Sequence, residues 1–246
     1  GDHRDLHSFP TRRSSDLLPF ASKGNGFEGL DAELLINGEF GVKHVSALAK
    51  WQEEGIFHYG GRGDSANWIF LNEECAMMPH SSGLIGSMKQ SGLNWAAAPL
   101  PHWGDPYPKV NTIIGGATLW VLNGHESEEY KGVAEFLKFV AQPEQQAWWH
   151  KQTGYVPISL PAAEMLTAEG HFEAQPFQKV AINELNNAPP TRDTMGIRLG
   201  NFVEIRNVVE EELENIFAGK KSVKAGLDDA VKRSNELLRE FAEIYQ

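Results

Sequence analysis

The sequence has almost no cysteine and no long hydrophobic run. Its 246 residues include one cysteine, Cys75, so no disulfide can form within the chain. No stretch of 18 or more apolar residues occurs, and a helix that spans a membrane needs such a stretch. Cys75 begins a short apolar run, residues 75–78, that is typical of a buried strand. We therefore expect a structural thiol and not a nucleophile at this position, and no membrane-spanning helix.

The common catalytic and metal-binding patterns are also missing. The nine histidines are scattered, and neither HExxH nor a paired Cys/His spacing occurs. There is no G-x-S-x-G elbow and no Walker A sequence. The adjacent carboxylates at 73–74 and 210–212 have a spacing typical of solvated surface. We therefore predict a protein that is not an enzyme, with no catalytic residue, no metal site and no cofactor. His150, beside two tryptophans at a predicted helix end, is expected to serve packing.

Positive charge is scarce. The chain has 22 Lys and Arg against 33 Asp and Glu, which gives a formal net charge of −11. An excess of this sign argues against nucleic acid or an anionic membrane surface as a partner. It does not exclude an anionic ligand, because a few local donors can outweigh a diffuse and screened field. The apolar share of 41% is ordinary for a globular protein.

The first 17 residues differ in character from the rest of the chain. Residues 7–17, HSFPTRRSSDL, resemble one translated frame of a sequencing-adapter oligonucleotide, and a native polar linker is the alternative. Residues 1–17 are therefore assigned to a non-native segment and set aside. The sequence LPF at 18–20 then opens in mid-domain, so we expect the N-terminal half of the protein to precede it.

Periodicity predicts an α/β protein with a mostly parallel, covered sheet. Apolar runs predict strands at 75–78, 95–100 and 112–122. Helical spacing predicts helices at 40–54, 64–71, 81–90, 127–140, 144–152, 198–217 and 222–245. Pro143 suits the first turn of its helix, Gly55 a C-cap and Ser222 an N-cap. The apolar stripe of the last helix is expected to be core.

Two stretches in the middle of the chain suggest anion binding. Ser81 opens the predicted helix at 81–90, where free backbone N–H groups and the helix dipole favour a phosphate or carboxylate. The alternative is that Ser81 or Ser82 only caps that helix. Gly116, the second glycine of IIGGA, strips side chains from a predicted strand end and lets a ligand approach the backbone, although a hinge or bulge is equally consistent.

Two side chains later in the sequence are further candidates. Tyr155 in TGYVP follows a helix and offers a hydroxyl from a turn, with a core tyrosine as the alternative. Arg206 lies on a helix whose apolar residues turn inward, and a guanidinium matches phosphate geometry in bidentate fashion. An ion pair with Glu210, one turn further on, is the alternative for Arg206.

The order of these segments carries a family resemblance. The segments are LPFASK at 18–23, IIGGA at 113–117, TGYVPI at 153–158 and GIRLGN at 196–201. In this order they resemble the glycerol-3-phosphate-binding proteins of ABC uptake systems, members of the maltose-binding-protein-like extracellular solute-binding protein family 1. The similarity covers residues 18–246 and corresponds to the C-terminal portion of such proteins. The Pro79-His80 pair before Ser81 is atypical for this family.

The resemblance implies a periplasmic-binding-protein-like (type II) fold of two α/β lobes with the ligand between them. Residues 18–112 and 165–246 would belong to the second lobe, and 113–164 to the crossing segment and part of the first. The implied ligand contacts are Ser81, Gly116, Tyr155 and Arg206. Without the rest of the first lobe, ligand binding is expected to be weak or absent.

The implied function is delivery of sn-glycerol 3-phosphate or a glycerophosphodiester to a membrane permease by a monomeric protein. The implied location is the periplasm, or the outer face of the membrane, by a tether, in a Gram-positive source. A sugar-binding protein of the same superfamily is the first alternative. A phosphoesterase acting on the same ligand is a second, and an interaction domain without a small-molecule ligand is a third.

Overall fold

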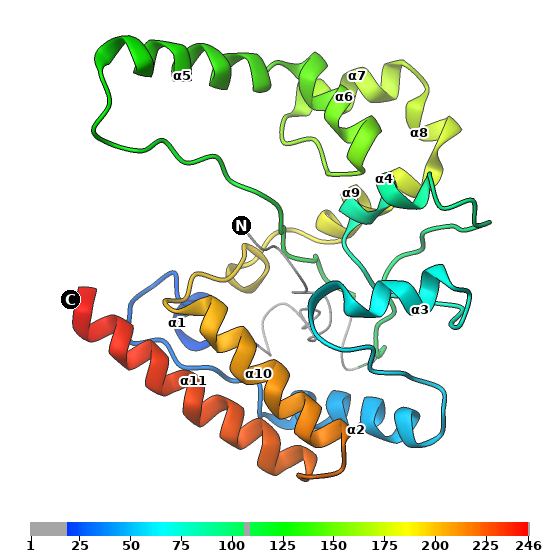
Figure 1. Cartoon of the computed structure of the whole chain (residues 1–246), viewed down its shortest axis with the longest axis vertical. Helices are drawn as coiled ribbons and strands as arrows, with labels where there is room; N and C mark the ends of the chain where they lie inside the picture. Colours follow the sequence, from blue (N-terminus) through cyan, green and yellow to red (C-terminus); the bar gives the residue numbers. More distant parts are fainter. Residues whose placement is uncertain (1–18, 106–108, 246) are drawn as a thin grey trace. The chain divides into compact units, whose positions relative to one another are not determined.

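The computed structural model describes residues 19–105 and 109–245. Residues 1–17, assigned above to a non-native segment, lie outside this part of the chain. The described residues divide into two compact units. The α6 unit contains residues 79–101 and 115–185, and the α10 unit contains residues 19–78, 102–105, 109–114 and 186–245. Both units are built mainly from helices (Figure 1).

The α10 unit has two long C-terminal helices as its frame. Its elements are α1 (Ser22–Asn25), α2 (Glu39–Glu53), η1 (Gly63–Ala66), α3 (Asn67–Leu71), η4 (Arg192–Thr194), α10 (Phe202–Phe217) and α11 (Val223–Tyr245). Helices α10 and α11 run side by side (Figure 1), and their facing stripes bury Ile205 and Leu227 almost completely. The predicted apolar stripe of α11 is therefore confirmed as core. The Ser222 N-cap is confirmed too, because its Oγ accepts from Ala225 N at 3.3 Å.

Helix α10 begins four residues later than predicted, and the GIRLGN segment explains the delay. Gly196 has φ +135°, and Asn201 has φ +48°, so the backbone before Phe202 is not helical. Asn201 Nδ2 donates to Leu237 O at 3.0 Å, which ties this corner to α11. At Gly200 an added Cβ would lie 2.1 Å from Phe241 Cγ, so only glycine fits. The segment therefore fixes where α10 begins and where Arg206 lies along it.

The α6 unit contains only short and medium helices. Its elements are η2 (Ser82–Leu84), α4 (Ile85–Met88), α5 (Ser127–Val140), α6 (Pro143–Thr153), α7 (Leu160–Ala168), α8 (His171–Ala174), η3 (Pro176–Lys179) and α9 (Val180–Leu185). The predicted pair at 127–140 and 144–152 is confirmed, with Pro143 in the first turn of α6. The small core packs Leu166 and Phe172 against Ala147. His150 is fully buried beside Phe172, so its packing role is also confirmed.

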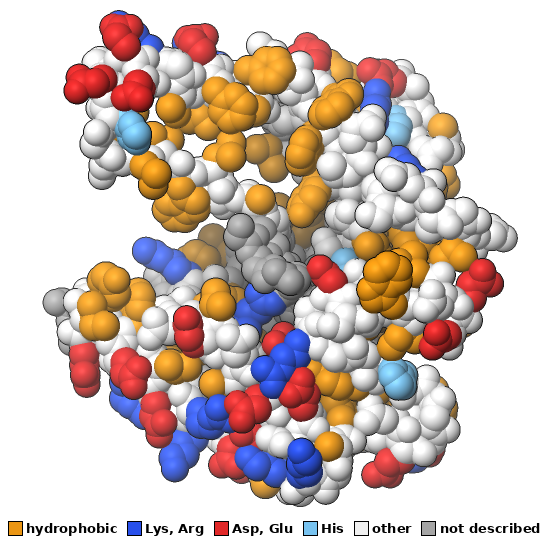
Figure 2. Space-filling model, in the orientation of Figure 1, with side chains coloured by type: hydrophobic (Ala, Val, Ile, Leu, Met, Phe, Trp, Pro, Cys, Tyr) orange, Lys and Arg blue, Asp and Glu red, His pale blue; other side chains and the backbone are white. Residues whose placement is uncertain are grey.

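Many apolar side chains of the α6 unit are at the surface (Figure 2). Trp120 is 85% exposed and Leu122 is 71% exposed in the extended segment before α5. Large apolar residues on the helices share this exposure: Phe136, Phe139, Trp148, Trp149 and Leu160. Monomeric globular proteins rarely leave so much apolar surface in one region.

The predicted strands are wrong in the described part of the chain. Residues 75–78, 95–100 and 112–122 form no strand there, and the α/β sheet expected from them is not seen. Ala21 and Leu34 form an isolated antiparallel bridge. A strand exists only when a neighbour completes its hydrogen-bonded ladder, and these segments find no ladder partner among the described residues. Cys75 is correspondingly half-buried and Met77 is 88% exposed, which corrects the expected buried strand.

The two shorter predicted helices break into pieces. Residues 64–71 become the 3₁₀ turn η1 followed by α3. Residues 81–90 become η2 followed by the four-residue α4.

No helix in the described ranges combines the length and the apolar character that crossing a membrane requires.

Candidate ligand-binding site

Ser81 caps a very short helical turn. Its φ and ψ are −62° and 145°, and its Oγ accepts from Gly83 N at 3.2 Å. The predicted capping role is therefore real. The turn it caps has three residues and continues into four more, so the helix-dipole contribution expected here is small. The Ser81 hydroxyl hydrogen finds no acceptor among the described residues, so capping leaves this hydroxyl able to donate to a ligand.

Tyr155 lies against the same turn. A Cβ added to Gly83 would lie 3.1 Å from Tyr155 Cε2 and Cζ and 3.4 Å from its hydroxyl oxygen, so the ring packs on bare backbone. A Cβ added to Gly154 would lie 2.4 Å from Ser82 O. Gly154 also has φ +80° as the C-cap of α6. The two glycines therefore allow the turn at 81–83 and the corner at 153–155 to meet, which places the Tyr155 ring against the turn that begins at Ser81.

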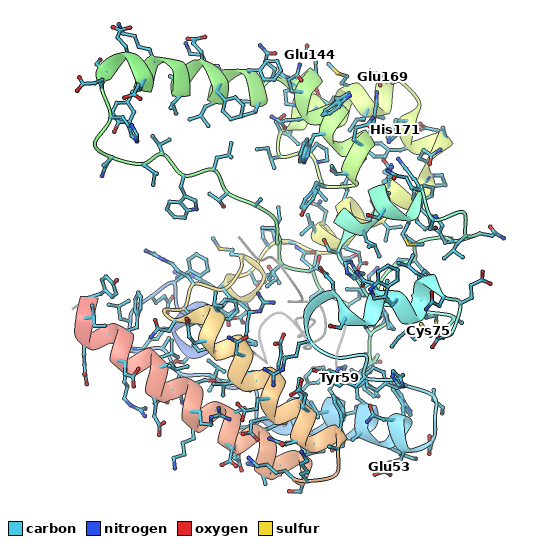
Figure 3. All side chains as sticks on the ribbon, viewed as in Figure 1. Glu53, Tyr59, Cys75, Glu144, Glu169 and His171 are labelled. Carbon is cyan, nitrogen blue, oxygen red and sulfur yellow. The ribbon has the colours of Figure 1, made fainter. Side chains whose placement is uncertain are left out.

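Hydrogen bonds fix the backbone of this corner. Gly154 N donates to His150 O at 2.8 Å, and Tyr155 N donates to Thr153 Oγ1 at 3.2 Å. His150 Nδ1 lies 2.8 Å from Tyr155 O. His150 belongs to α6 and His171, labelled in Figure 3, begins α8; their ring centroids are 5.5 Å apart. The alternative of Tyr155 as a core residue does not apply, because its side chain is only partly buried.

Gly116 is in the α6 unit, in the extended segment after Ile114. Its φ is +135°, a conformation that other residues rarely adopt, and nothing lies within 4 Å of where a Cβ would be. The glycine is therefore required by backbone conformation and leaves open space beside it. The structure records no close approach of Gly116 to Ser81 or Tyr155.

Arg206 belongs to the α10 unit. Its neighbours Ile205 and Val209 are buried, and Arg206 itself is partly buried. Within residues 19–105 and 109–245 its guanidinium makes no ion pair or hydrogen bond, and the alternative of a pair with Glu210 is not formed. By contrast, Arg62 in the same unit is held by Glu214 at 2.5 Å. Arg206 is thus a candidate ligand-binding cation that no carboxylate of the described chain neutralises.

Three residues that support the corner are absent from the predicted site. Gly83 and Gly154 act by close backbone approach, which the sequence letters SSG and TGY suggest only in part. His150 acts through a ring nitrogen on a backbone oxygen. The sequence feature that could have indicated this role is the position of His150, five residues before Tyr155 at the end of a predicted helix. In the described part of the chain, no three His, Cys, Asp or Glu residues are grouped in a way that could hold a metal ion.

The comparison with protein families decides the classification. Residues 3–176 match the bacterial extracellular solute-binding proteins. The chain belongs to this family.

Two curated relatives are close in sequence. The sn-glycerol-3-phosphate-binding periplasmic protein UgpB of Salmonella typhimurium is 44% identical over 226 residues, which are 91% of this chain and 52% of the relative. The protein of the same name from Escherichia coli K12 is 43% identical over the same shares. The chain therefore spans about half the length of the curated relatives it matches. The family resemblance predicted from the sequence is confirmed.

Solved structures of solute-binding proteins share the fold. UgpB from Mycobacterium tuberculosis, in complex with glycerophosphocholine, matches 84% of this chain and 50% of its own with a TM-score of 0.67 at 21% identity. The maltose/maltodextrin-binding domain MalE of Bdellovibrio bacteriovorus, bound to maltotriose, matches 94% of this chain and 58% of its own, with a TM-score of 0.64 at 14% identity. The fold of the described residues is that of periplasmic solute-binding proteins, although no strand is formed among them.

Proposed function

We propose that this chain is part of the solute-binding component of an ABC importer and takes sn-glycerol 3-phosphate or a glycerophosphodiester as ligand. The curated relatives are named for sn-glycerol 3-phosphate, and the Mycobacterium tuberculosis relative was solved with glycerophosphocholine. Both ligands contain a phosphate group attached to glycerol. A site for them needs a cation for the phosphate and neutral donors for the hydroxyls.

The observation that supports the phosphate most directly is the unpaired Arg206. A partly buried guanidinium in a chain of net charge −11 would ordinarily be neutralised by a carboxylate. Arg206 has no such partner among the described residues. Its planar fork of donors can hold two phosphate oxygens at once.

Ser81 and Tyr155 supply neutral groups suited to glycerol. The Ser81 hydroxyl retains a free donor after capping Gly83, and the Tyr155 hydroxyl lies beside the same turn. A hydroxyl can both donate and accept, as a glycerol hydroxyl does. Gly116, with open space at its Cα, would let a ligand reach the backbone. These four residues form the proposed ligand set, with no bond made or broken.

The wider setting is proposed from the family. The complete protein would have two lobes of the type II class, with residues 18–112 and 165–246 in the second lobe and 113–164 in the crossing segment and part of the first. It would bind as a monomer and deliver the ligand to the permease. It would act in the periplasm, the location for which the curated relatives are named, or on a membrane tether in a Gram-positive source.

A neutral sugar is the second candidate ligand, because the maltotriose-bound relative shares the fold. Arg206 discriminates the two candidates. A neutral sugar carries no negative charge to pair with Arg206, whereas a phosphate does. A phosphoesterase would need a nucleophile or a metal, and the site proposed here uses neither.

Calorimetric titration of the complete gene product with sn-glycerol 3-phosphate, glycerophosphocholine and maltose tests the proposal. Both phosphate ligands should bind, and Arg206→Ala should weaken them by roughly 10- to 100-fold, the scale of a lost charge-assisted hydrogen bond. Arg239→Ala, an exposed arginine on α11, is the matched control and should leave affinity unchanged. Binding of maltose but of neither phosphate would overturn the ligand and leave the family standing.

A further inference from the structure

His150 occupies an unusual place for a packing residue. It lies on the last turn of α6, its side chain is 0% exposed, and its Nδ1 is 2.8 Å from the backbone oxygen of Tyr155. Its own backbone oxygen accepts from Gly154 N at 2.8 Å. One residue thus holds the corner twice, once through its main chain and once through its ring. The second bond is the one that depends on histidine.

The chemistry of the bond fixes the tautomer. A carbonyl oxygen can only accept, so Nδ1 must carry the hydrogen and donate it to Tyr155 O. In the neutral ring Nε2 then keeps its lone pair, and it finds no partner among the described residues although it is buried. A ring chosen only to fill space would not need this donor. An apolar side chain of similar size would fill the site and avoid an unpartnered nitrogen.

The surroundings of the ring favour its neutral form. Burial lowers the pKa of His150, and the nearby His171, Lys89 and Lys151 act in the same direction. The bond to Tyr155 O acts in the opposite direction. His171 Nε2 is engaged by Gln178 Oε1 at 2.6 Å and Lys151 by Glu169, so neither turns toward His150 as a hydrogen-bond partner. The ring is therefore held as a neutral donor with one acceptor, the backbone of Tyr155.

The position of the Tyr155 ring follows from the position of its backbone. The ring lies on the bare Cα of Gly83, where a shift of a few tenths of an ångström changes the contact. The hydroxyl at the end of the ring moves further than the backbone that carries it. A bond on Tyr155 O close to the Cα is therefore an effective place from which to aim the hydroxyl.

We propose that His150 is a positioning residue for Tyr155: its Nδ1–H holds the corner at 153–155 so that the Tyr155 hydroxyl is aimed at the ligand. The inference rests on the proposed function, because it assumes that the hydroxyl meets the ligand. It assigns to His150 a role in affinity that packing alone does not give.

Three substitutions separate the donor from the volume. In His150→Asn the side-chain amide nitrogen takes the place of Nδ1 and retains a donor for Tyr155 O. In His150→Gln the amide reaches the place of Nε2 and leaves Tyr155 O without a donor. In His150→Leu the volume is kept and both nitrogens are lost. Stability is measured in parallel by thermal unfolding, because the small core beside Phe172 is common to all three.

Calorimetric titration of sn-glycerol 3-phosphate into the complete gene product and its variants reads the affinity. His150→Leu and His150→Gln should bind about tenfold more weakly, and His150→Asn should stay within about threefold of the wild type. The decisive measurement is a double-mutant cycle with Tyr155→Phe. If His150 acts through the hydroxyl, the loss caused by His150→Gln should largely disappear in the Tyr155→Phe background.

The possible outcomes are distinct. A loss that is the same with and without the Tyr155 hydroxyl overturns the positioning role and leaves the proposed function intact. Equal affinities of the Asn and Gln variants overturn it as well, and this comparison stands even if His150→Leu does not fold. Failure of the wild type to bind either sn-glycerol 3-phosphate or glycerophosphocholine overturns the proposed function and the role of His150 in it. Nitrogen NMR of the wild-type ring should show the Nδ1–H tautomer, and the Nε2–H tautomer would contradict the assigned bond without any ligand.

Discussion

The two units of the chain bury their apolar residues to different extents. In the α10 unit one continuous cluster joins α2, α10 and α11 with the segment around Leu34 and Ile36, which are 2% and 0% exposed. In the α6 unit the corresponding cluster is small and centres on Leu166 and Phe172. Stability grows with apolar area removed from water, so the α10 unit is expected to supply most of the folding free energy.

Charge is also used differently in the two units. Glu212 on α10 is only 2% exposed. Its carboxylate forms ion pairs with Lys221 at 2.6 Å and with Arg233 at 2.8 Å, and these make a network at the edge of the core. The pairs on α5, such as Lys131 with Glu128, are well exposed. Exposed pairs of this kind contribute little. The α6 unit, which contains Ser81 and Tyr155, is therefore the part of the chain with the smaller core and the weaker ion pairs.

The largest expected effect comes from cutting into the core of the α10 unit. Ile205→Ala removes a side chain that is 0% exposed between α10 and α11. The free energy of unfolding should fall by about 2–5 kcal/mol, since the lost burial and the cavity add. Val203→Ala, 61% exposed on the same helix, should change it by less than about 0.5 kcal/mol. Urea unfolding followed by circular dichroism measures both, and similar values for the two variants would contradict the core assigned here.

The longer helices of the chain were predictable because their signals are local. Apolar spacing, Pro143 and Ser222 gave α5, α6 and α11 with nearly correct ends. The start of α10 was missed because Asn201 adopts φ +48° under the influence of a hydrogen bond to α11, which is not adjacent in sequence. The strands were missed because an extended apolar run becomes a strand only when a partner pairs with it.

The site shows the same division between local and distant information. The residue types of Ser81 and Tyr155 suggested donors, but their meeting depends on Gly83 and Gly154, whose close approaches are tertiary. Arg206 could be singled out on its helix, whereas its lack of an ion pair within the described chain needs the structure. His150 was expected to pack, and its bond to Tyr155 O is a three-dimensional fact.

A smaller effect is expected from pH, and it contrasts one histidine in each unit, His44 and His150. In the α10 unit His44 Nδ1 accepts from Trp103 Nε1 at 3.1 Å, so it must be unprotonated. Burial lowers the pKa of His44 from 6.5 to about 4. Because the folded pKa lies below the unfolded one, the stability is fully present above pH 6.5. It is lost as pH falls from 6.5 toward 4, by up to about 3 kcal/mol.

Replacement by asparagine removes this dependence in a defined way. In His44→Asn the side-chain oxygen can accept from Trp103 in place of Nδ1, and the group no longer titrates. Urea unfolding between pH 4 and pH 7 should therefore give a flatter profile for His44→Asn than for the wild type. In His150→Asn the asparagine must instead donate, through its amide nitrogen, to Tyr155 O. The two asparagine variants therefore test opposite hydrogen-bond directions, one in each unit. An unchanged slope in His44→Asn would show that other groups govern the acid loss.

The smallest effect on stability is expected from the exposed apolar surface of the α6 unit. Trp120→Ser and Leu122→Ser replace side chains that are 85% and 71% exposed, so each should change the free energy of unfolding by less than about 0.5 kcal/mol. Binding of the dye ANS should nevertheless fall, because the dye reports apolar surface that water can reach. Trp68→Ser, 68% exposed on α3, is the matched control in the α10 unit. If it lowered dye binding as much as Trp120→Ser, the apolar surface would belong to both units, and the difference drawn between them would be one of core size alone.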